Sequence, residues 1–561
     1  MTLLISMKKN IVLLLLFFSC VLAVAQDLKT TEIKVVEGLK VSVPDAFKLN
    51  TKASFSDTTK QDKTQKYSFI DQVYYSDFVT RSLVAAKIKS KAKLDFNSTS
   101  IRLSLGNYSF KSASITYNSK YKKSFSYGLG LVTNNNKYTT EEDEYSVKNN
   151  SQKLYFFTKS ILAKNIISSS LNYEKLVAQH DFSNTFNNDN ENQFTYSKLL
   201  CSIKSRQAGS KGFSHETLLF LADFNSFTEN HIGLYTDISN TFNSLPYNLS
   251  IEYNNYINYG NEETALGRDK KDVKIVDFTP SIFINKNDFD IDLGFNLGFE
   301  HNASESVIDV FPKIKISKEF VDDILSMTFG IHRTDYRNTI NSLSRENPYI
   351  HSFGLGGTKD TINYTHDLQT TDIYESYFNL SNKLSKNETL NFEIGYGKVL
   401  NFHYYDLLPI AGYNRFGVNY IDVWQLRVNG EYNRKFNNIL SMNLNIDYYN
   451  WFDLVVPYKA NLIGCFKIPF KLRNKIKITP SLDYIGQREA NQMSLNLIHP
   501  PEFNLIQLDE QYLINLSVSY NYSKSLGFYI DFNNLSNSKK QLWNGYQQLG
   551  LNMVFGLNCL F

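Results

Sequence analysis

The chain has 561 residues, a formal net charge of +4 and 14% aromatic residues, with 37 Tyr and 41 Phe. So many aromatic side chains can bury enough surface to order the chain, which excludes a disordered protein. After the first 25 residues no stretch approaches the roughly 18 consecutive apolar residues that a membrane-spanning helix needs, which excludes a helical membrane protein. No basic patch with interleaved aromatic residues occurs, so nucleic acid is not an expected partner.

The chain begins with the pattern of a secretory signal peptide. Lys8 and Lys9 form a basic start, Ile11–Leu22 is an apolar stretch, and Ala23–Ala25 is an A-x-A cleavage motif. Residues 1–25 are therefore predicted to be removed after export. Cys20 raises lipidation as the alternative, although the residues before it lack the Leu expected three positions upstream.

Residues 26–99 form a polar lead segment, rich in Lys, Ser, Thr and Asp, with few apolar runs. We expect this segment to lie in the periplasm. Its stretch Tyr67–Val84 is aromatic, with Phe69, Tyr74, Tyr75 and Phe78, and this content suggests a partial occluder of the domain that follows.

The rest of the chain, residues 100–561, repeats a period of two. In Phe289–Glu300, large apolar residues alternate with Asp, Asn, Gly and Glu, so the two kinds of side chain lie on opposite faces of a strand. Leu390–Gly397, Met442–Tyr448 and Tyr512–Asn521 repeat the pattern. The sequence therefore predicts an all-β domain of amphipathic strands.

Two architectures use such strands. A soluble sandwich turns the apolar face inward, whereas a transmembrane barrel turns it toward lipid and leaves the polar face to a wet lumen. Many of the strands exceed the roughly five or six residues common in soluble sheets and reach the nine to eleven that a tilted membrane strand needs. Together with the signal peptide and the Tyr and Phe at strand ends, this length predicts a transmembrane antiparallel β-barrel.

The connections predict the topology. Reading from Ser100 we count about 22 strands joined by alternating long and short loops, and bacterial outer-membrane barrels have an even strand number, short periplasmic turns and long external loops. We therefore expect the outer membrane of a Gram-negative bacterium as the location. The long polar connections are Asn134–Gln152, His180–Gln193, Gly260–Asp272, Asn338–Thr370, Tyr404–Gly417 and Arg488–Asp509.

Several carboxylates fall on the polar faces of these strands and are predicted to face the lumen, where charges tune selectivity. A wetted wall without a specific role is the simpler interpretation. The residues are Asp290, Asp292, Glu300, Glu393 and Asp447.

The chain ends inside an amphipathic strand. Phe555, Leu557 and Phe561 share its apolar face, and a terminal Phe of this kind resembles the signal that the outer-membrane barrel-assembly machinery recognises. We therefore expect that machinery and outer-membrane lipid as partners.

The stretch before this strand carries a family resemblance. Tyr520–Tyr522, Phe528–Leu535 and Trp543–Tyr546 resemble the last strands of TonB-dependent receptors, and Tyr484–Arg488 resembles an earlier strand of their barrels. The resemblance implies a barrel of about 22 strands with a plugged lumen, and passage or capture of a solute at the cell surface.

The N-terminal region departs from that family, because residues 26–99 are too short for the folded plug that precedes the barrel in such receptors. The lumen would then be occluded by this segment, by inward-folded loops such as Asn338–Thr370, or by a partner protein. Glu32, Ile33, Val35 and Val36 resemble the short segment through which receptors contact TonB, and they could add a strand to a partner sheet. An ordinary strand or an unstructured lead is the alternative for these residues.

The sequence contains no pattern typical of a catalytic site, a metal site or a phosphate-binding site. The nine His residues have no metal-ligand spacing, and neither a nucleophile elbow nor a phosphate-binding loop occurs. Asn187–Asn192 offers oxygen donors for calcium but lacks the order of a calcium loop, so a solvated loop is expected. We predict no catalytic residue, no cofactor and no metal.

Three functions remain open. The first is a TonB-dependent-receptor-like barrel, the second is an unplugged porin-like channel or a structural scaffold for partner proteins, and the third is an outer-membrane enzyme. Because no catalytic constellation is recognisable, the chain is not expected to be an enzyme. An ordered insert in the lumen favours the first function, and an open conducting pore favours the second.

Overall fold

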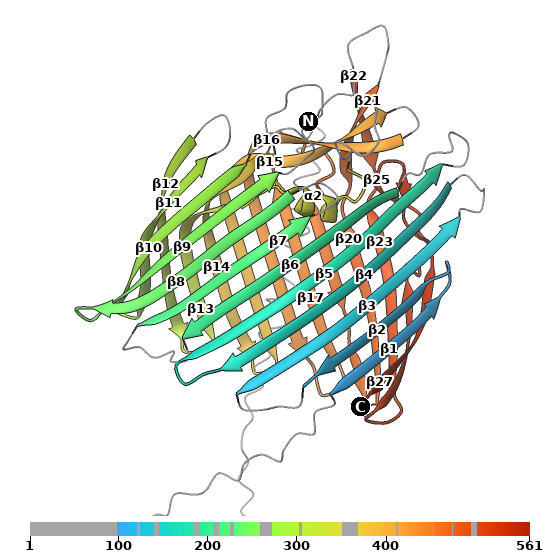
Figure 1. The fold of residues 1–561 in the computed structure, drawn as a ribbon, viewed down its shortest axis with the longest axis horizontal. Helices are drawn as coiled ribbons and strands as arrows, with labels where there is room; N and C mark the ends of the chain where they lie inside the picture. The colour runs from blue at the N-terminus through green and yellow to red at the C-terminus, as the bar shows by residue number, and fades with distance from the viewer. Residues whose placement is uncertain are drawn as a thin grey trace, which may run out of the picture. The chain divides into compact units, whose positions relative to one another are not determined.

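The computed structural model describes residues 98–119, 124–139, 145–182, 191–205, 213–224, 229–258, 272–301, 306–350, 368–410, 413–452, 454–473, 475–494 and 502–561. Their strands form one closed antiparallel barrel of 22 strands, which confirms the predicted fold class (Figure 1). The barrel closes where β1 (Thr99–Gly106) pairs with β27 (Asn552–Leu560). The predicted signal peptide, nearly all of the lead segment and the predicted TonB contact lie outside the described residues.

Strands β1 to β17 follow one another around the wall, and each pairs with the next. After β1 their bounds are β2 (Lys111–Asn118), β3 (Phe125–Thr139), β4 (Tyr145–Ile161), β5 (Asn165–Phe182), β6 (Glu191–Ser205), β7 (Ser214–Phe224), β8 (Glu229–Phe242), β9 (Leu245–Asn258), β10 (Val273–Lys286), β11 (Phe289–His301), β12 (Ser306–Val321), β13 (Leu325–Arg337), β14 (Thr370–Ser385), β15 (Glu388–Ile410), β16 (Tyr413–Lys435) and β17 (Ser441–Asn450).

The last part of the wall is shorter. β18 (Leu462–Lys467) and β19 (Phe470–Leu472) act as one interrupted strand, because both pair with β20 (Ile476–Ile485). The wall then continues through β23 (Gln511–Asn521) and β24 (Leu526–Asn533) to β27. The remaining elements are α2 (Ile340–Glu346), β21 (Arg488–Ser494), β22 (Glu502–Leu508), β25 (Gln541–Trp543) and β26 (Tyr546–Gln547). In the described part of the chain, no helix is long and apolar enough to cross a membrane.

Apolar side chains cover the outside of the wall. In β11, Leu293 and Phe295 are 36% and 44% exposed, whereas Asp292 and Gly298, at alternate positions, are buried. Alternation therefore assigns the polar set to the inner face. Closure of the barrel pairs the strands with their neighbours, as strands in lipid require, except in the upper part of β12 and β13, where the ladder ends at Ile314↔Ile331.

Tight turns close the rim at which the C-terminus lies (Figure 1). Asn243 and Ser244 between β8 and β9 have φ of 47° and 70°, and Asn287 and Asp288 between β10 and β11 have φ of 53° and 63°. Two successive residues with positive φ form the type I′ turn, whose twist matches that of the flanking strands. Short turns at one rim, which the alternation of long and short loops predicts, are confirmed at these two positions.

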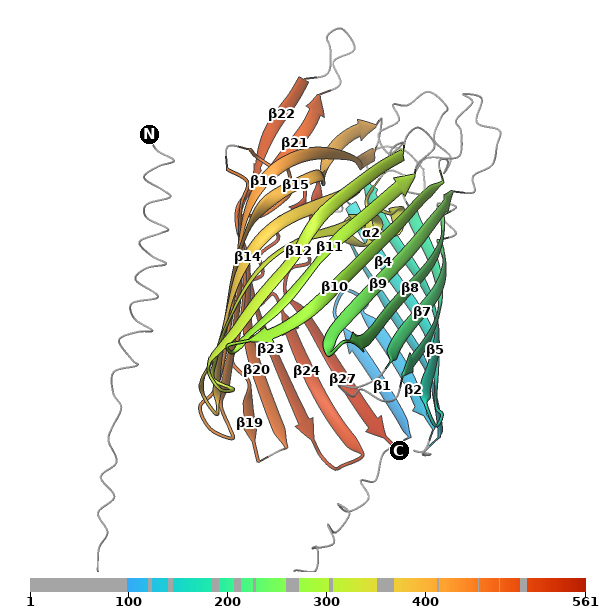
Figure 2. The ribbon, with the colours of Figure 1, turned by 90° about the vertical axis from the view of Figure 1, so that its left-hand side faces the viewer.

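At the opposite rim the strands continue as hairpins through segments predicted as loops. Within Asn134–Gln152, β3 and β4 stay in register, and within Tyr404–Gly417, β15 and β16 pair as far as Ile410↔Tyr413. Arg488–Asp509 contains the β21–β22 hairpin, which projects beyond the wall (Figures 1 and 2). The loop predictions were wrong there, because a strand that leaves the membrane loses its one-sided apolar pattern while its backbone ladder continues.

A β-bulge bends the β15–β16 hairpin over the mouth of the barrel (Figures 1 and 2). The register shifts by one residue between Val399 and Phe402, and Asn401 has a φ of 52°. The backbone N–H of Asn401 donates to the Asp422 carboxylate at 2.9 Å, which holds the bulge. An extra residue on one strand increases its local bend and twist, so the upper hairpin leaves the wall.

Glycines in the wall make room for aromatic rings on the neighbouring strand. A Cβ atom at Gly130 would lie 2.0 Å from the ring of its cross-strand partner Tyr155, and one at Gly556 would lie 1.9 Å from the ring of Tyr529. The same arrangement joins Gly233 to Phe220 and Gly330 to Tyr377.

Candidate functional site: a hairpin folded into the barrel

The ladder between β12 and β13 stops halfway up the wall, at the pair Ile314↔Ile331. Beyond that pair, β12 stays in register with β11, and β13 stays in register with β14. The upper part of β13–β14, which comprises His332–Arg337 and Thr370–Glu375, is called the inner hairpin below.

The contacts of Arg333 show where the inner hairpin lies. Alternation puts Arg333 on the same face of β13 as Phe329, whose side chain is 44% exposed on the outside of the wall. Nevertheless, its guanidinium lies 3.0 Å from Asp277 of β10 and 3.0 Å from Asp309 of β12. Both aspartates belong to the inner face of their strands. An outer face can meet an inner face only if the inner hairpin lies inside the wall formed by β10–β12.

Arg333 is the centre of what we call the arginine cluster. Besides the two aspartates named above, it contacts Asp372 at 2.7 Å and Asp335 at 3.7 Å, and its side chain is only 8% exposed. Gly298 leaves the space for this arrangement, because a Cβ there would lie 2.6 Å from Arg333 Nη1. A guanidinium offers five N–H donors in a fixed fork, so one arginine can join the inner hairpin to two strands of the wall.

Above the arginine cluster the chain enters the lumen. Arg337 lies 3.7 Å from Glu300 of β11, and buried Glu229 of β8 accepts a hydrogen bond from the backbone N–H of Ile340 at 3.2 Å. Thr339 begins α2 as its N-cap, and its hydroxyl accepts a hydrogen bond from the backbone of the first turn. These contacts carry the chain from β13 to β8, five strands away in the order of the wall.

Helix α2 lies inside the barrel near its mouth, and its last turn contacts two parts of the wall (Figures 1 and 2). Arg345 donates to Glu174 of β5 at 2.7 Å. The next residue, Glu346, contacts His403 of β15 at 2.7 Å and Lys459 of the β17–β18 connection at 2.5 Å. β5 and β15 are ten strands apart in a ring of 22, which is almost opposite.

The contacts of Glu346 favour the charged form of its carboxyl. Burial alone would raise the pKa of this carboxyl, but the hydrogen bond from His403 and the charge of Lys459 outweigh burial and lower the pKa to about 2. Glu346 is therefore ionised at neutral pH, and α2 keeps both contacts to this side of the mouth.

An apolar cluster, called the mouth core, packs against α2. Leu343 of α2 is 2% exposed, and Tyr405 of β15 and Phe416 of β16 are fully buried. Trp543 and Tyr546 join them from the connection between β24 and β27. Segments from distant parts of the chain thus meet beside α2, so α2 is held near the mouth by side-chain packing as well as by ion pairs. The other buried members are Ile350, Leu407, Val418, Tyr458, Ala490 and Leu508.

The five carboxylates predicted to face the lumen do not come together in one site. Four instead have a polar partner on a neighbouring strand: Glu393 with Arg427 at 2.7 Å, Asp292 with Lys313 at 3.7 Å, Asp290 with Asn285 at 2.7 Å, and Asp447 with Asn429. The fifth, Glu300 of β11, lies 3.7 Å from Arg337 of the inner hairpin. Their role in selectivity stays a prediction.

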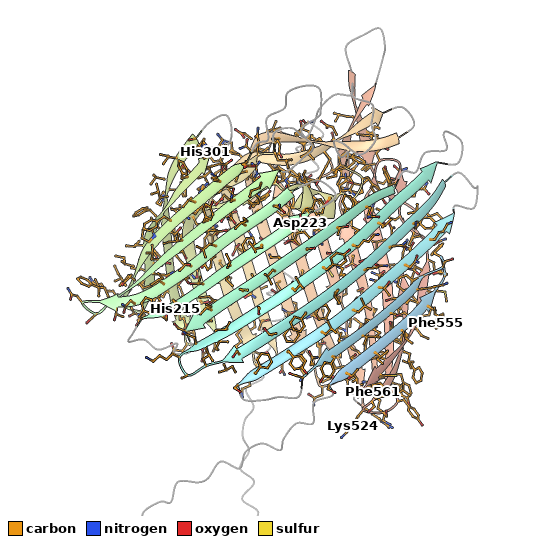
Figure 3. All side chains as sticks on the ribbon, in the orientation of Figure 1. His215, Asp223, His301, Lys524, Phe555 and Phe561 are labelled. Atoms are coloured by element: carbon orange, nitrogen blue, oxygen red, sulfur yellow. The ribbon has the colours of Figure 1, made fainter. Side chains whose placement is uncertain are left out.

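The residues predicted as an assembly signal lie on the closing strand. Phe555 and Phe561 are 51% and 64% exposed; Phe561 lies at the rim where the chain ends, and Phe555 lies further up the side of the wall (Figure 3). Leu557 pairs with Leu103 of β1, so the strand that carries the signal also closes the wall. Recognition by an assembly machinery stays a prediction.

Sequence reasoning missed the arginine cluster, although the sequence contains a sign of it. The outer-face positions of β13 change from Phe329 and Ile331 to Arg333, Asp335 and Arg337 within one strand. A strand that stayed in the wall would present these charges on its outer face. The change from apolar to charged residues could therefore have revealed that the strand leaves the wall.

The described residues contain no group of three or more His, Cys, Asp or Glu side chains that could hold a metal ion. Cys201, Cys465 and Cys559 are free thiols. The oxygen-rich segment Asn187–Asn192 falls largely outside the described residues.

No protein-family profile and no curated protein matches the chain. Among solved structures, the chain is similar to the FrpB iron transporter from Neisseria meningitidis (F3-3 variant), with a TM-score of 0.61 and 9% identity over 83% of this chain and 82% of that one. It is also similar to the copper transporter OprC (TM-score 0.60, 8% identity, 83% and 81% covered) and to the siderophore receptor PirA from Acinetobacter baumannii (0.59, 10%, 84% and 81%). At these identities the likeness shows the fold, and at that level it confirms the resemblance carried by the C-terminal strands.

Proposed function

We propose that the chain is an outer-membrane barrel that passes or captures a solute at the cell surface, as the TonB-dependent receptors that it resembles do. The observation that carries the proposal is a barrel of 22 strands whose lumen contains α2. The last turn of α2 contacts strands on nearly opposite sides of that barrel. A permanently open porin would not need such an insert. The proposal excludes enzymatic activity and assigns no cofactor.

The solved structures that share this fold support the same class of function. Those named above are described as an iron transporter, a copper transporter and a siderophore receptor. The substrate of this chain is not fixed by that likeness, because only the barrel fold is shared. The exposed apolar belt supports outer-membrane lipid as the surroundings, and Phe561 supports the barrel-assembly machinery as a partner.

Coupling to TonB is part of the proposal. Glu32, Ile33, Val35 and Val36 are the residues that would make this contact by adding a strand to the partner. The occluder we propose is α2 together with the inner hairpin. Helix α2 lies in the segment Asn338–Thr370, whose inward folding was one of the alternatives that the sequence left open, whereas the inner hairpin was not predicted.

Liposome swelling tests the proposed function. Liposomes that contain the full-length protein should swell little in a series of uncharged solutes of increasing size. Replacement of residues 339–347 by a flexible Gly-Ser linker should permit swelling, because it removes α2 while leaving every ladder of the wall intact. The same length of linker in place of residues 494–502, which join β21 to β22 and include no residue of the mouth core, is the matched control and should not permit it.

Two outcomes would contradict the proposal. Full swelling with the full-length protein would support the porin-like alternative. No swelling with any variant, while each is shown to be folded by heat-modified mobility in electrophoresis, would support a structural scaffold.

A further inference from the structure

Two strand edges in the upper wall have no partner among the described strands. β12 from Ser306 to Lys313 pairs only with β11, and β13 from His332 to Arg337 pairs only with β14. The free stretch of β12 is also more exposed than the apolar belt beside it, with Ile308 at 69%. An unpaired row of backbone N–H and C=O groups is costly in a barrel wall.

We propose that β12 and β13 pair along these edges in a second conformation, which withdraws the inner hairpin and α2 from the lumen. The barrel then carries its own gate. The proposal rests on the proposed function only in treating the lumen as the path of a solute.

The existing ladder fixes the register of the second conformation. Ser317↔Thr328 and Ile314↔Ile331 belong to one unshifted register. Continued upward, it pairs Lys313 with His332, Phe311 with Thr334, and Asp309 with Tyr336. Directly opposed residues in an antiparallel pair share a face, so all six side chains would then belong to the inner face of the wall.

The two conformations exchange one set of interactions for another. The occluded one has the arginine cluster, the ion pairs of α2 and the mouth core. The paired one gains ladder hydrogen bonds but turns Arg333, Asp335 and Arg337 to the outer face, beside Val310 and Ile308. Charges on that face are least costly near the rim, which is the end of the strand that these residues occupy.

The arginine cluster therefore sets the balance between the conformations. A change that weakens it shifts the population toward the paired conformation, because a two-state equilibrium responds to the difference in stability between its states. Arg333→Gln is the sharpest such change, since it removes the charge that four aspartates share. Arg333→Lys keeps the charge and is its conservative counterpart.

Disulfide trapping in the full-length protein tests the second conformation. The background replaces Cys201, Cys465 and Cys559 by serine. The test pair is Phe311→Cys with Thr334→Cys. The control pair is Ser317→Cys with Thr328→Cys, which the ladder already holds in register with hydroxyl oxygens 3.0 Å apart.

The control pair should cross-link at the same rate in every background. The test pair should cross-link slowly with Arg333 present and at an intermediate rate with Arg333→Lys. With Arg333→Gln it should cross-link about tenfold faster than with Arg333, which is the scale expected for losing a charge-assisted hydrogen bond. Failure of the test pair in all backgrounds, while the control pair forms, would overturn the second conformation. If Arg333→Gln does not reach the membrane, Gly298→Val replaces it, because the added Cβ collides with Arg333 Nη1.

Conductance separates this inference from the proposed function. A barrel cross-linked through the test pair should conduct more than the same barrel after reduction. If it does not, while the barrel without α2 passes solutes, the gate is wrong and the proposed function stands. If neither barrel passes solutes, the proposed function itself fails.

Discussion

Truncation of Leu343 tests whether packing of α2 holds the lumen closed. Leu343 is 2% exposed and lies in the mouth core with Tyr405 and Phe416. Replacing a buried Leu by Ala costs about 2–5 kcal/mol, from lost burial and from the cavity that remains. Because α2 contributes no pairing to the wall, this cost falls on the docking of α2 rather than on the stability of the barrel.

The size of the effect follows from that cost. About 1.4 kcal/mol is a factor of ten in an equilibrium constant. The ratio of docked to undocked α2 in Leu343→Ala should therefore fall roughly 30-fold to several-thousand-fold. Leu343→Glu should have a larger effect, because it would bury a charge in an apolar cluster.

Single-channel recording in planar bilayers measures this change. Leu343→Ala should spend more time conducting than the unmodified protein. Leu505→Ala is the matched control, since Leu505 of β22 is 64% exposed and its truncation leaves α2 untouched. Folded Leu343→Ala and Leu343→Glu barrels as silent as the unmodified protein would refute the reasoning.

Three further changes test other parts of the structure. Acidification from about pH 4.5 toward pH 2 should undock α2 and raise conductance. The pKa of Glu346 is lowered to about 2 from 4.5, so its stabilisation is present above pH 4.5 and is lost as pH falls through the folded value. Glu346→Gln should weaken this dependence without abolishing it, because acid also neutralises Glu174 in its ion pair with Arg345. Gly130→Val should lower the urea midpoint of unfolding by displacing the Tyr155 ring, an overpacking cost of about 1–3 kcal/mol, whereas Gly430→Val should change it less, since nothing lies within 4 Å of a Cβ there. Deletion of Phe561 should reduce heat-modifiable protein in the outer membrane, and unchanged levels would argue against its role in assembly.

The barrel itself was predictable from the sequence, for a physical reason. A strand in lipid must keep an apolar face at every second residue, so Phe289–Glu300 shows its fold locally. The tight turns were predictable as well, because Asn287 and Asp288 are residues that accept the positive φ of a type I′ turn.

The inner hairpin was not predictable in the same way. Arg333 and Asp277 are 56 residues apart in the sequence. They are in contact only because the upper part of β13 leaves the wall and lies on the inner side of β10. The mouth core likewise joins α2 to segments as distant as Trp543, and no local pattern encodes such a meeting. Outside the membrane both faces of a strand are wet, so the hairpins of that region carry no period of two.

Zero-length cross-linking with a carbodiimide tests most directly whether the last turn of α2 contacts both walls of the barrel. This reagent joins an amine to a carboxylate in contact with it, as Lys459 and Glu346 are at 2.5 Å. Arg345→Lys supplies an amine for Glu174 on the nearly opposite wall. Lys153→Arg accompanies it, because Lys153 lies 2.8 Å from Glu174 and one carboxylate can form only one amide. The native Lys204–Glu216 pair at 2.5 Å is the internal control. Mass spectrometry of the digested double variant should find α2 linked to both sides within one molecule. A digest with the Lys204–Glu216 link but with α2 linked to neither side would contradict the account.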